Sequence, residues 1–350
     1  MAWDERFYVV CRGSQGSGTR WWCTDARRLS IHKTDPQFSP LPRPKMSNLR
    51  SFSVFGAATF SQLFPRGMPS LGFKLLRVLE LRGTPIVVIP NEVFDLFNLR
   101  HLGLSLPCKI SKLQSLRHLF INNKIEAHKH RITRFIFRGE TLTGGWKLKG
   151  LQTLRTVSCN TEIARKIGRL TQMRSLSIMG VRSVHGMDLC TSITKMERIL
   201  HLCIIAVKEH MGEVLCLDFL SPPPSHLLKL LLIRQMEGVP RARAEVPRAI
   251  VPRVEGVARV EDAELGECGF LARGMPELRE LQFRSCVELM EPLKGVHYLT
   301  KLQQLSLVLM PEEFIEKMRR MDRSSSAFKH IADVKYHSRG ADGRWTVQLL

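Results

Sequence analysis

The first residues with chemically useful spacing are glycines near the N-terminus. Residues 13–20 read GSQGSGTR, in which Gly13 and Gly18 have the spacing of a phosphate-binding P-loop. That loop needs Lys and then Ser or Thr after its last glycine, because the Lys reaches the phosphates and the hydroxyl binds Mg²⁺. Thr19 and Arg20 occupy those two positions here. The sequence therefore disfavours nucleotide binding at this loop, and we expect no cofactor.

A pair of alternating histidines is the next candidate for chemistry. His128 and His130 could be metal ligands, but only Glu126 accompanies them and no Cys or carboxylate cluster completes a set. Neither a GxSxG nucleophile motif nor an HExxH zinc motif occurs in the chain. A Ser/His/Asp or Cys/His site stays open, because such groups converge in space rather than in sequence. Nothing favours one, so we expect neither a metal nor an enzyme.

A basic stretch follows between residues 128 and 155, with Glu140 as its single acid from residue 129 onward. Phe135, Phe137 and Trp146 lie among the cations. Cations with aromatic residues are typical of single-stranded nucleic acid binding, but no nucleic-acid-binding fold signature accompanies them. An acidic protein surface, or a solvated loop without a partner, is favoured over nucleic acid. The cations of this candidate basic patch are Lys129, Arg131, Arg134, Arg138, Lys147, Lys149 and Arg155.

Composition narrows the class of protein. The 350 residues carry a formal net charge of +21, which favours acidic partners without naming them. The nine cysteines include no CxxC pair, which favours reduced thiols in a reducing compartment. The N-terminus lacks the pattern of a secretory signal, and no run of 18 apolar residues suggests a transmembrane segment. We expect a soluble, cytoplasmic protein.

The elements that must position any site are short repeats. Residues 75–90 read LLRVLELRGTPIVVIP, and their LxxLxL core recurs along the chain. Start points such as Leu49, Leu76 and Leu99 lie 27 and 23 residues apart, within the 20–29-residue period of leucine-rich repeats. The copies begin at Ala26, Leu49, Leu76, Leu99, Leu116, Leu151, Met173, Ile199, Leu227, Leu278 and Leu302.

The physics of one repeat predicts the fold. In the first complete copy, the two-residue period of a strand places Leu79 and Leu81 on one face, and the returning segment buries Ile86 and Ile89 against them. No repeat can bury its apolar face alone, so neighbours must stack. We predict an α/β leucine-rich repeat solenoid, a right-handed superhelix with a concave parallel β-sheet.

Interruptions of the pattern set the expected boundaries. Residues 1–25 are predicted to be irregular, 26–234 to form repeats, and 270–321 to form the final repeats with a capping helix. Between them, 235–269 contain three VPR tripeptides and no LxxLxL, which predicts an atypical insert. Residues 322–350 are expected to be a C-terminal tail.

The residues flanking the buried strand positions are expected to point into the concave face and to bind a protein there. Phe120 and Met179 are expected to be exposed anchors, because aromatic and Met residues are enriched at interfaces, although isolated exposed apolar residues are also ordinary. The candidate residues are Val78, Glu80, Arg82, His101, Ser105, His118, Phe120, Asn122, Ser175, Ser177, Met179, Glu280, Gln282, Arg284, Gln304 and Ser306.

Several phrases are more specific than the repeat itself. Residues 94–105 (FDLFNLRHLGLS), 110–119 (ISKLQSLRHL) and above all 160–202 (NTEIARKIGRLTQMRSLSIMGVRSVHGMDLCTSITKMERILHL) resemble the C-terminal leucine-rich repeat domain of plant intracellular nucleotide-binding disease-resistance receptors of the coiled-coil class. The phrases at 26–32, 217–232 and 275–320 fit its first and later repeats, so the resemblance covers about 26–234 and 270–336.

The resemblance implies a role in plant defence. In that family the repeat domain helps recognise pathogen effectors or altered host proteins and restrains a nucleotide-binding switch domain, so the implied partner is a protein of one of these kinds and not a small-molecule substrate. The coiled coil and nucleotide-binding module are missing here, so ATP exchange is not expected of this chain alone. The alternative function is a basic scaffold that binds RNA or an anionic membrane through residues 128–155, which salt dependence would distinguish.

Overall fold

The structure of the protein, a computed structural model, describes residues 8–12, 26–32, 46–55, 72–82, 91–104, 110–121, 147–207, 220, 223–235, 275–286, 296–320, 329–340 and 342–350. The P-loop-like glycines, the two alternating histidines and the VPR tripeptides lie outside these residues, so the predictions made for them stay predictions.

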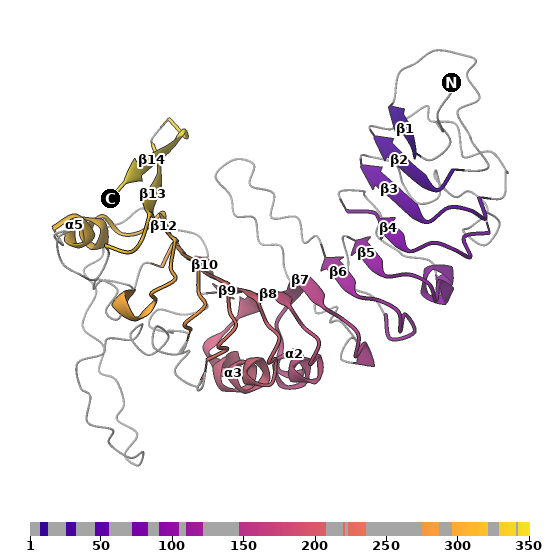
Figure 1. The fold of residues 1–350 in the computed structure, drawn as a ribbon, viewed down its shortest axis with the longest axis horizontal. Helices are drawn as coiled ribbons and strands as arrows, with labels where there is room; N and C mark the ends of the chain where they lie inside the picture. Colours follow the sequence, from indigo (N-terminus) through magenta and orange to yellow (C-terminus); the bar gives the residue numbers. More distant parts are fainter. Residues whose placement is uncertain are drawn as a thin grey trace. The chain divides into compact units, whose positions relative to one another are not determined.

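The LxxLxL segments form parallel strands, each pairing with the strand of the next repeat (Figure 1). The described strands are β1 (Tyr8–Arg12), β2 (Arg28–His32), β3 (Ser51–Phe55), β4 (Val78–Glu80), β5 (His101–Leu104), β6 (His118–Ile121), β7 (Thr153–Ser158), β8 (Ser175–Val181), β9 (His201–Val207), β10 (Lys229–Gln235), β11 (Glu280–Arg284), β12 (Gln304–Val308), β13 (Asp333–Arg339) and β14 (Trp345–Leu349).

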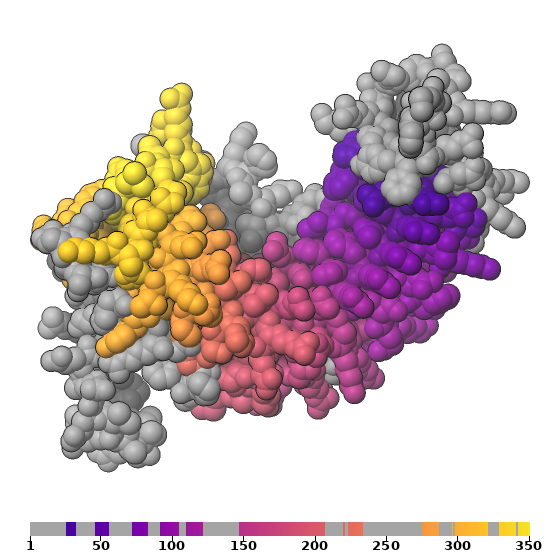
Figure 2. Space-filling model, viewed as in Figure 1, coloured from indigo at the N-terminus to yellow at the C-terminus, as the bar shows by residue number. Residues whose placement is uncertain are grey.

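The chain divides into two compact units. Unit 1 contains Met1–Glu126, Phe135–Ser158 and Arg169–Ser177, with strands β1 to β7 in sequence order. Unit 2 contains Ala127–Arg134, Cys159–Gly168 and Ile178–Leu350, with β9 to β14 in sequence order. In Figure 2 the colour changes in successive bands along unit 1, because each repeat packs against the repeats next to it in sequence.

The LxxLxL strands send their two repeat positions into the core, which confirms the predicted phase, except that Leu232 of β10 is only half-buried. Leu79 and Leu81 are 0% and 1% exposed, and Leu102, Leu119 and Leu305 are fully buried. The weaker copies agree, since Phe52 and Val54 of β3 are also fully buried. Burying such side chains contributes about 1.5–3 kcal/mol each relative to exposure. The core is therefore one layer of stacked apolar side chains behind each sheet.

A repeating hydrogen bond fixes the register of neighbouring repeats. The carbonyl of Arg77 accepts from the backbone N–H of Arg100 at 2.8 Å and from that of His101 at 2.9 Å. The carbonyl of Arg100 accepts in the same way from the next repeat, at Arg117 and His118. Because successive copies within each unit repeat this geometry, equivalent residues lie side by side on neighbouring strands.

Helices occupy the returning segments of some repeats. They are α2 (Thr161–Lys166), α3 (Gly186–Thr194) and α5 (Glu312–Arg320), with 3₁₀ helices at Asn91–Asp95, Ile167–Arg169, Ser183–His185 and Val296–Tyr298. Asn160 caps α2, since its side chain accepts from the N–H of Ile163 at 2.7 Å. Between α2 and α3, the Ser192 hydroxyl donates to the Ala164 carbonyl at 2.5 Å. These helices close the core of their repeats from the side opposite the sheet.

One repeat contains an extra residue in its strand. Leu154 and Val157 of β7 are both buried although they lie three residues apart, and Thr156 between them has φ 64°. Positive φ is uncommon for a non-glycine residue and interrupts strict strand alternation. The predicted copy at residues 151–157 therefore forms, with a bulge that explains its weak match to LxxLxL.

Both ends differ from the predicted boundaries. Tyr8–Arg12, expected to be irregular, form β1 and pair with β2 in parallel. Residues 322–350, expected to be a tail, contain β13, which pairs in parallel with β12, and β14, which pairs antiparallel with β13. These strands are held by backbone pairing with their neighbours. Every residue of β14 is exposed, so its sequence has no LxxLxL pattern from which the strand could have been predicted.

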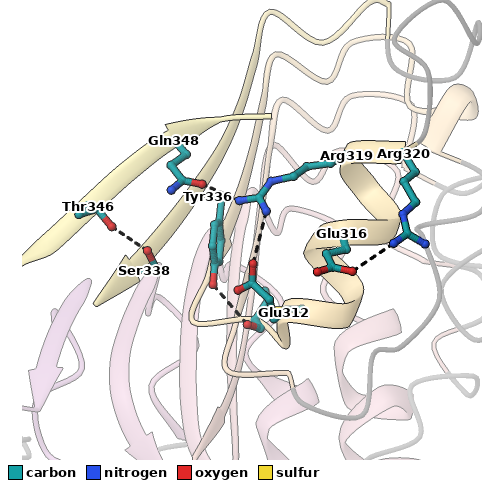
Figure 3. Close-up of polar contacts among 9 residues, drawn as sticks. Glu312, Glu316, Arg319, Arg320, Tyr336, Ser338, Thr346 and Gln348 are labelled. Atoms are coloured by element: carbon teal, nitrogen blue, oxygen red, sulfur yellow. Dashed lines mark hydrogen bonds and ion pairs between the residues drawn. The ribbon is translucent and has the colours of Figure 1, made fainter. Parts of the chain in front are cut away.

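The predicted capping helix is present but is followed by this strand pair. Helix α5 buries Phe314, Ile315 and Met318. Its Arg319 donates to Gln348 of β14 at 2.7 Å and pairs with Glu312 at 3.3 Å, as Figure 3 shows. Ser338 and Thr346 are hydrogen-bonded across the two strands at 2.7 Å. Arg319 thus links the helix to the hairpin at this end of unit 2.

Candidate functional site

The residues between the buried leucines lie on the face of each sheet opposite the core, here called the open face. In unit 1 the register aligns Ser30, Ser53 and Glu80 with Gly103, Phe120 and Arg155 on successive strands. The predicted candidates Val78, His101, His118 and Phe120 are partly exposed on this face, as is Arg82 just after β4. Ser105 and Asn122 lie outside the described residues.

A buried carboxylate organises the centre of this face. The Glu80 side chain is 7% exposed and accepts from Arg82 Nε and Nη2, both at 2.7 Å, and from the Arg82 backbone N–H at 3.0 Å. His101 Nε2 lies 3.1 Å from the second carboxylate oxygen. A paired, bidentate arginine is the geometry in which a buried charge is stable. Glu80 was predicted as a binding residue, but its burial gives it the role of holding Arg82 and His101 in place.

The electrostatics of Glu80 follow from these contacts. Burial by itself would raise the pKa of Glu80, but hydrogen bonds from His101 and Arg82 and the positive charge of Arg82 outweigh it and lower the pKa to about 2. The carboxylate is therefore ionised at neutral pH. The pKa of His118 is lowered, first by burial and then by the nearby charges of His101 and Arg117.

Gly103 makes room for this carboxylate. It is the register partner of Glu80 on β5, and a Cβ there would lie 2.1 Å from Glu80 Oε1 and 2.5 Å from its Cδ. No real Cβ approaches another atom so closely, so a side chain at 103 would displace the carboxylate. The glycine is needed for close approach rather than for its backbone angle.

Phe120 is the apolar centre of the open face. Its ring stacks on His101 at 4.9 Å between centroids. The Arg82 guanidinium carbon lies 4.8 Å from the ring centroid, and that of Arg155 lies 5.7 Å from it. Both distances are within the range of a cation–π contact. An aromatic ring held between two arginines is the kind of anchor that dominates protein interfaces.

Arg155 was assigned from sequence to the basic patch, and the structure places it on the open face instead, as the register partner of Phe120. It is exposed, and no carboxylate pairs with it among the described residues. Lys147 and Lys149 are also exposed. Lys129, Arg131, Arg134 and Arg138 lie outside the described residues, so the patch as a whole stays a prediction.

The open face of unit 2 has different chemistry. Glu280 pairs with Lys229 of the neighbouring strand, Arg284 is exposed, and Gln282 and Gln304 are partly exposed. Ser306 is buried and lies 3.3 Å from the Gln304 amide. No aromatic ring comparable to Phe120 lies among these described residues.

One predicted anchor is wrong. Met179 was expected to be exposed, but only 2% of it is accessible. On the same face of β8, Ser175 is also buried, whereas Ser177 between them is partly exposed. Strict alternation fails further along, where the adjacent residues Ile178 and Met179 are both buried and Gly180 has φ 72°. Met179 therefore belongs to the core.

Sequence reasoning also missed residues of the N-terminal strands. His32 of β2 stacks on Phe55 of β3 at 4.8 Å, and Phe55 is 42% exposed. The two residues are register partners in the repeat copies with the weakest LxxLxL match. Applying the same flanking rule to those copies would have found them.

Among the described residues, no group of three or more His, Cys, Asp and Glu side chains gathers as metal ligands would. None of their helices is long and apolar enough to cross a membrane.

The fold and the open face define a leucine-rich repeat protein. The family described as "leucine-rich repeat region" matches residues 48–284, and the chain belongs to it. Among curated proteins, the chain is 25% identical over 279 residues to disease resistance protein RPM1 of Arabidopsis thaliana, a match that covers 67% of this chain and 30% of that protein. It is 23% identical over 292 residues to disease resistance RPP8-like protein 3 of the same plant, covering 75% of this chain and 31% of that protein.

These matches confirm the resemblance to plant disease-resistance proteins, and the chain spans about a third of the length of those relatives. Solved structures similar to the chain include a leucine-rich repeat protein of Leptospira interrogans, at 14% identity and a TM-score of 0.38, covering 89% of this chain and 78% of that one. They also include the functional domain of InlJ from Listeria monocytogenes, at 12% identity and a TM-score of 0.32, covering 82% and 64%.

Proposed function

We propose that this chain is a non-enzymatic protein-binding module that acts in plant defence, and that the open face of unit 1 contacts its partner. The similarity to RPM1 and the RPP8-like protein supports the defence role. The binding role is supported by the position of Phe120, whose ring is contacted by Arg82 and Arg155 on an accessible sheet face. The partner classes are a pathogen effector, a host protein altered by one, or a nucleotide-binding receptor domain, all met in the cytoplasm.

The contacts explain how this face can bind. Glu80 fixes Arg82 and His101, and His101 in turn stacks on Phe120, so the ring is held in place before a partner arrives. Preorganised side chains lose little conformational entropy on binding. Arg155 is free to make a bidentate contact to an acidic group of the partner.

The test is co-purification from plant tissue, with and without pathogen challenge, using the tagged chain and quantitative mass spectrometry. Phe120→Ala and Arg155→Glu are expected to lose proteins that the unchanged chain retains. Arg174→Glu is the matched control, because Arg174 is exposed in the same unit and lies outside the Phe120 cluster. Far-UV circular dichroism confirms that each variant is folded.

Two results would contradict the proposal. One is a set of bound proteins that is unchanged by Phe120→Ala and Arg155→Glu. The other is recovery of RNA alone, released at high salt, which would favour the basic scaffold instead.

A further inference from the structure

A row of arginines runs along unit 1 at the entry to its strands. Five successive repeats, beginning at Ala26, Leu49, Leu76, Leu99 and Leu116, carry arginine at their second position. All five side chains are exposed. This arginine row consists of Arg27, Arg50, Arg77, Arg100 and Arg117.

Backbone hydrogen bonds place these arginines directly beside one another. The N–H of Arg50 donates to the Arg27 carbonyl and that of Arg77 to the Arg50 carbonyl, each at 2.8 Å. Arg100 and Arg117 continue the series at 2.8 and 2.9 Å. Parallel strands lie about 4.8 Å apart, so the row carries a positive charge at each step along roughly 19 Å.

Four of the five arginines have charges that the described residues do not neutralise. Arg50, Arg77, Arg100 and Arg117 make no ion pair and no side-chain hydrogen bond within the part of the chain that the structure describes. Like charges opposite one another on neighbouring strands are destabilising. An anionic partner that bridges them would remove this repulsion.

The fold does not require arginine at this position. In unit 2 the equivalent residues are Leu200, Leu228, Arg279 and Gln303, and they make the same backbone hydrogen bonds, at 2.8 Å from Leu228 to Leu200 and 2.9 Å from Gln303 to Arg279. The next two residues of the series in unit 1, Gln152 and Arg174, also keep the bond. An unbroken run of five arginines is therefore a property of these repeats and not of the architecture.

We propose that the arginine row binds an acidic segment of a protein, whose carboxylates pair with successive guanidinium groups. Guanidinium groups bind carboxylates through two parallel hydrogen bonds, and Arg keeps its charge at all physiological pH values. Single-stranded nucleic acid is disfavoured, because it needs aromatic rings for base stacking and no Phe, Tyr or Trp adjoins any of the five arginines in sequence. The site is separate from the Phe120 cluster and does not depend on it.

The probes for the test are fluorescent poly-glutamate and a single-stranded oligouridylate of matched charge, titrated by anisotropy at low and physiological salt. The test variant changes Arg77, Arg100 and Arg117 together to Gln. The control variant changes Arg169, Lys195 and Lys329 to Gln, which removes the same charge from exposed positions outside the row.

The arginine-row variant is expected to bind poly-glutamate at least about tenfold more weakly, whereas the control variant changes affinity far less. Thermal unfolding checks that both variants remain folded.

Three outcomes would overturn the proposal: equal losses in the two variants, which would indicate net charge alone; tighter, row-dependent binding of oligouridylate; or no binding of poly-glutamate at low salt. Since the co-purification test changes Phe120 and Arg155, either proposal can fail while the other stands.

Discussion

The Glu80 carboxylate occupies the space above Gly103 that any other residue would fill with its side chain. The two residues are register partners on β4 and β5, and Leu81 N–H donates to the Gly103 carbonyl at 2.8 Å beside them. The carboxylate therefore comes from one repeat, and the glycine that leaves room for it comes from the next. The organisation of Arg82, His101 and Phe120 depends on that relationship.

Gly103→Ala is expected to destabilise unit 1 by about 1–3 kcal/mol, because the new Cβ displaces a paired, buried carboxylate. The loss should shrink in a Glu80→Ala background, since the obstacle is then gone. Urea denaturation of the four proteins of this double-mutant cycle measures the coupling. Gly150→Ala is the control, as its nearest atom would be the Leu116 carbonyl oxygen at 4.0 Å. Equal losses in both backgrounds would contradict the geometry.

Glu80 is expected to make stability depend on pH in the acid range. Its folded pKa of about 2 lies below the ordinary 4.5, so its contribution is complete above about pH 4.5 and is lost as pH falls toward 2. The measurement compares urea midpoints of the unchanged chain and Glu80→Gln across this range. The contributions of the other carboxylates to the pH dependence cancel in this difference, because both proteins contain them. A difference that stays constant from pH 5 to about 2 would argue against a paired carboxylate.

Leu176→Ala tests the repeat core. Leu176 is 1% exposed, so truncation should cost about 2–5 kcal/mol through lost burial and a residual cavity. Ser177→Ala, one residue further along β8 and partly exposed, should cost far less. Chemical denaturation reports both values. A cost below about 1 kcal/mol for Leu176→Ala would mean that the repeat phase is wrong.

Gly168→Ala is expected to destabilise unit 2 in a way that no side-chain change can rescue. A Cβ at 168 would lie 2.9 Å from Ser192 Cα and 3.0 Å from its carbonyl oxygen, which are backbone atoms of α3. We expect a loss of about 1–3 kcal/mol by thermal or urea unfolding. Gly168→Ala combined with Ser192→Ala should recover none of that loss, in contrast to the Glu80 and Gly103 pair. Recovery in that double variant would show that the Ser192 side chain is the obstacle.

Cys159 is expected to react slowly with iodoacetamide. Burial raises the pKa of its thiol to about 12, so little thiolate is present at pH 8. Mass spectrometry should find little modification of Cys159 in the folded chain and rapid modification in urea. Modification at the same rate in both conditions would contradict the raised pKa of this thiol.

The repeat phase was predictable because it rests on a period that recurs many times. Leu79, Leu102 and Leu305 are buried as expected, since each copy obeys the same alternation. Departures arise where one copy breaks that rule: Thr156 inserts a residue into β7, and Met179 enters the core of β8. Such local exceptions depend on backbone geometry that cannot be predicted from the sequence of a single repeat.

The ends and the candidate site were harder to predict for a different reason. Strands β13 and β14 are held by backbone pairing with little apolar burial, so hydropathy carried no signal for them. On the open face, the sequence identified Glu80, Arg82 and Phe120, but it did not reveal that Glu80 is buried and paired with Arg82. Arg155 was grouped with neighbours in sequence, whereas the sheet pairs it with Phe120, 35 positions earlier.

The interlocking of Glu80 with Gly103 also limits how these repeats can evolve. Repeat arrays change readily by duplication and unequal recombination, because each unit contacts only its neighbours. A crossover that placed a different repeat after β4 would put a Cβ against the carboxylate, and one that removed β4 would leave His101 without its partner. The two repeats are therefore expected to be inherited as a pair, whereas the surrounding copies can be gained, lost or exchanged one at a time.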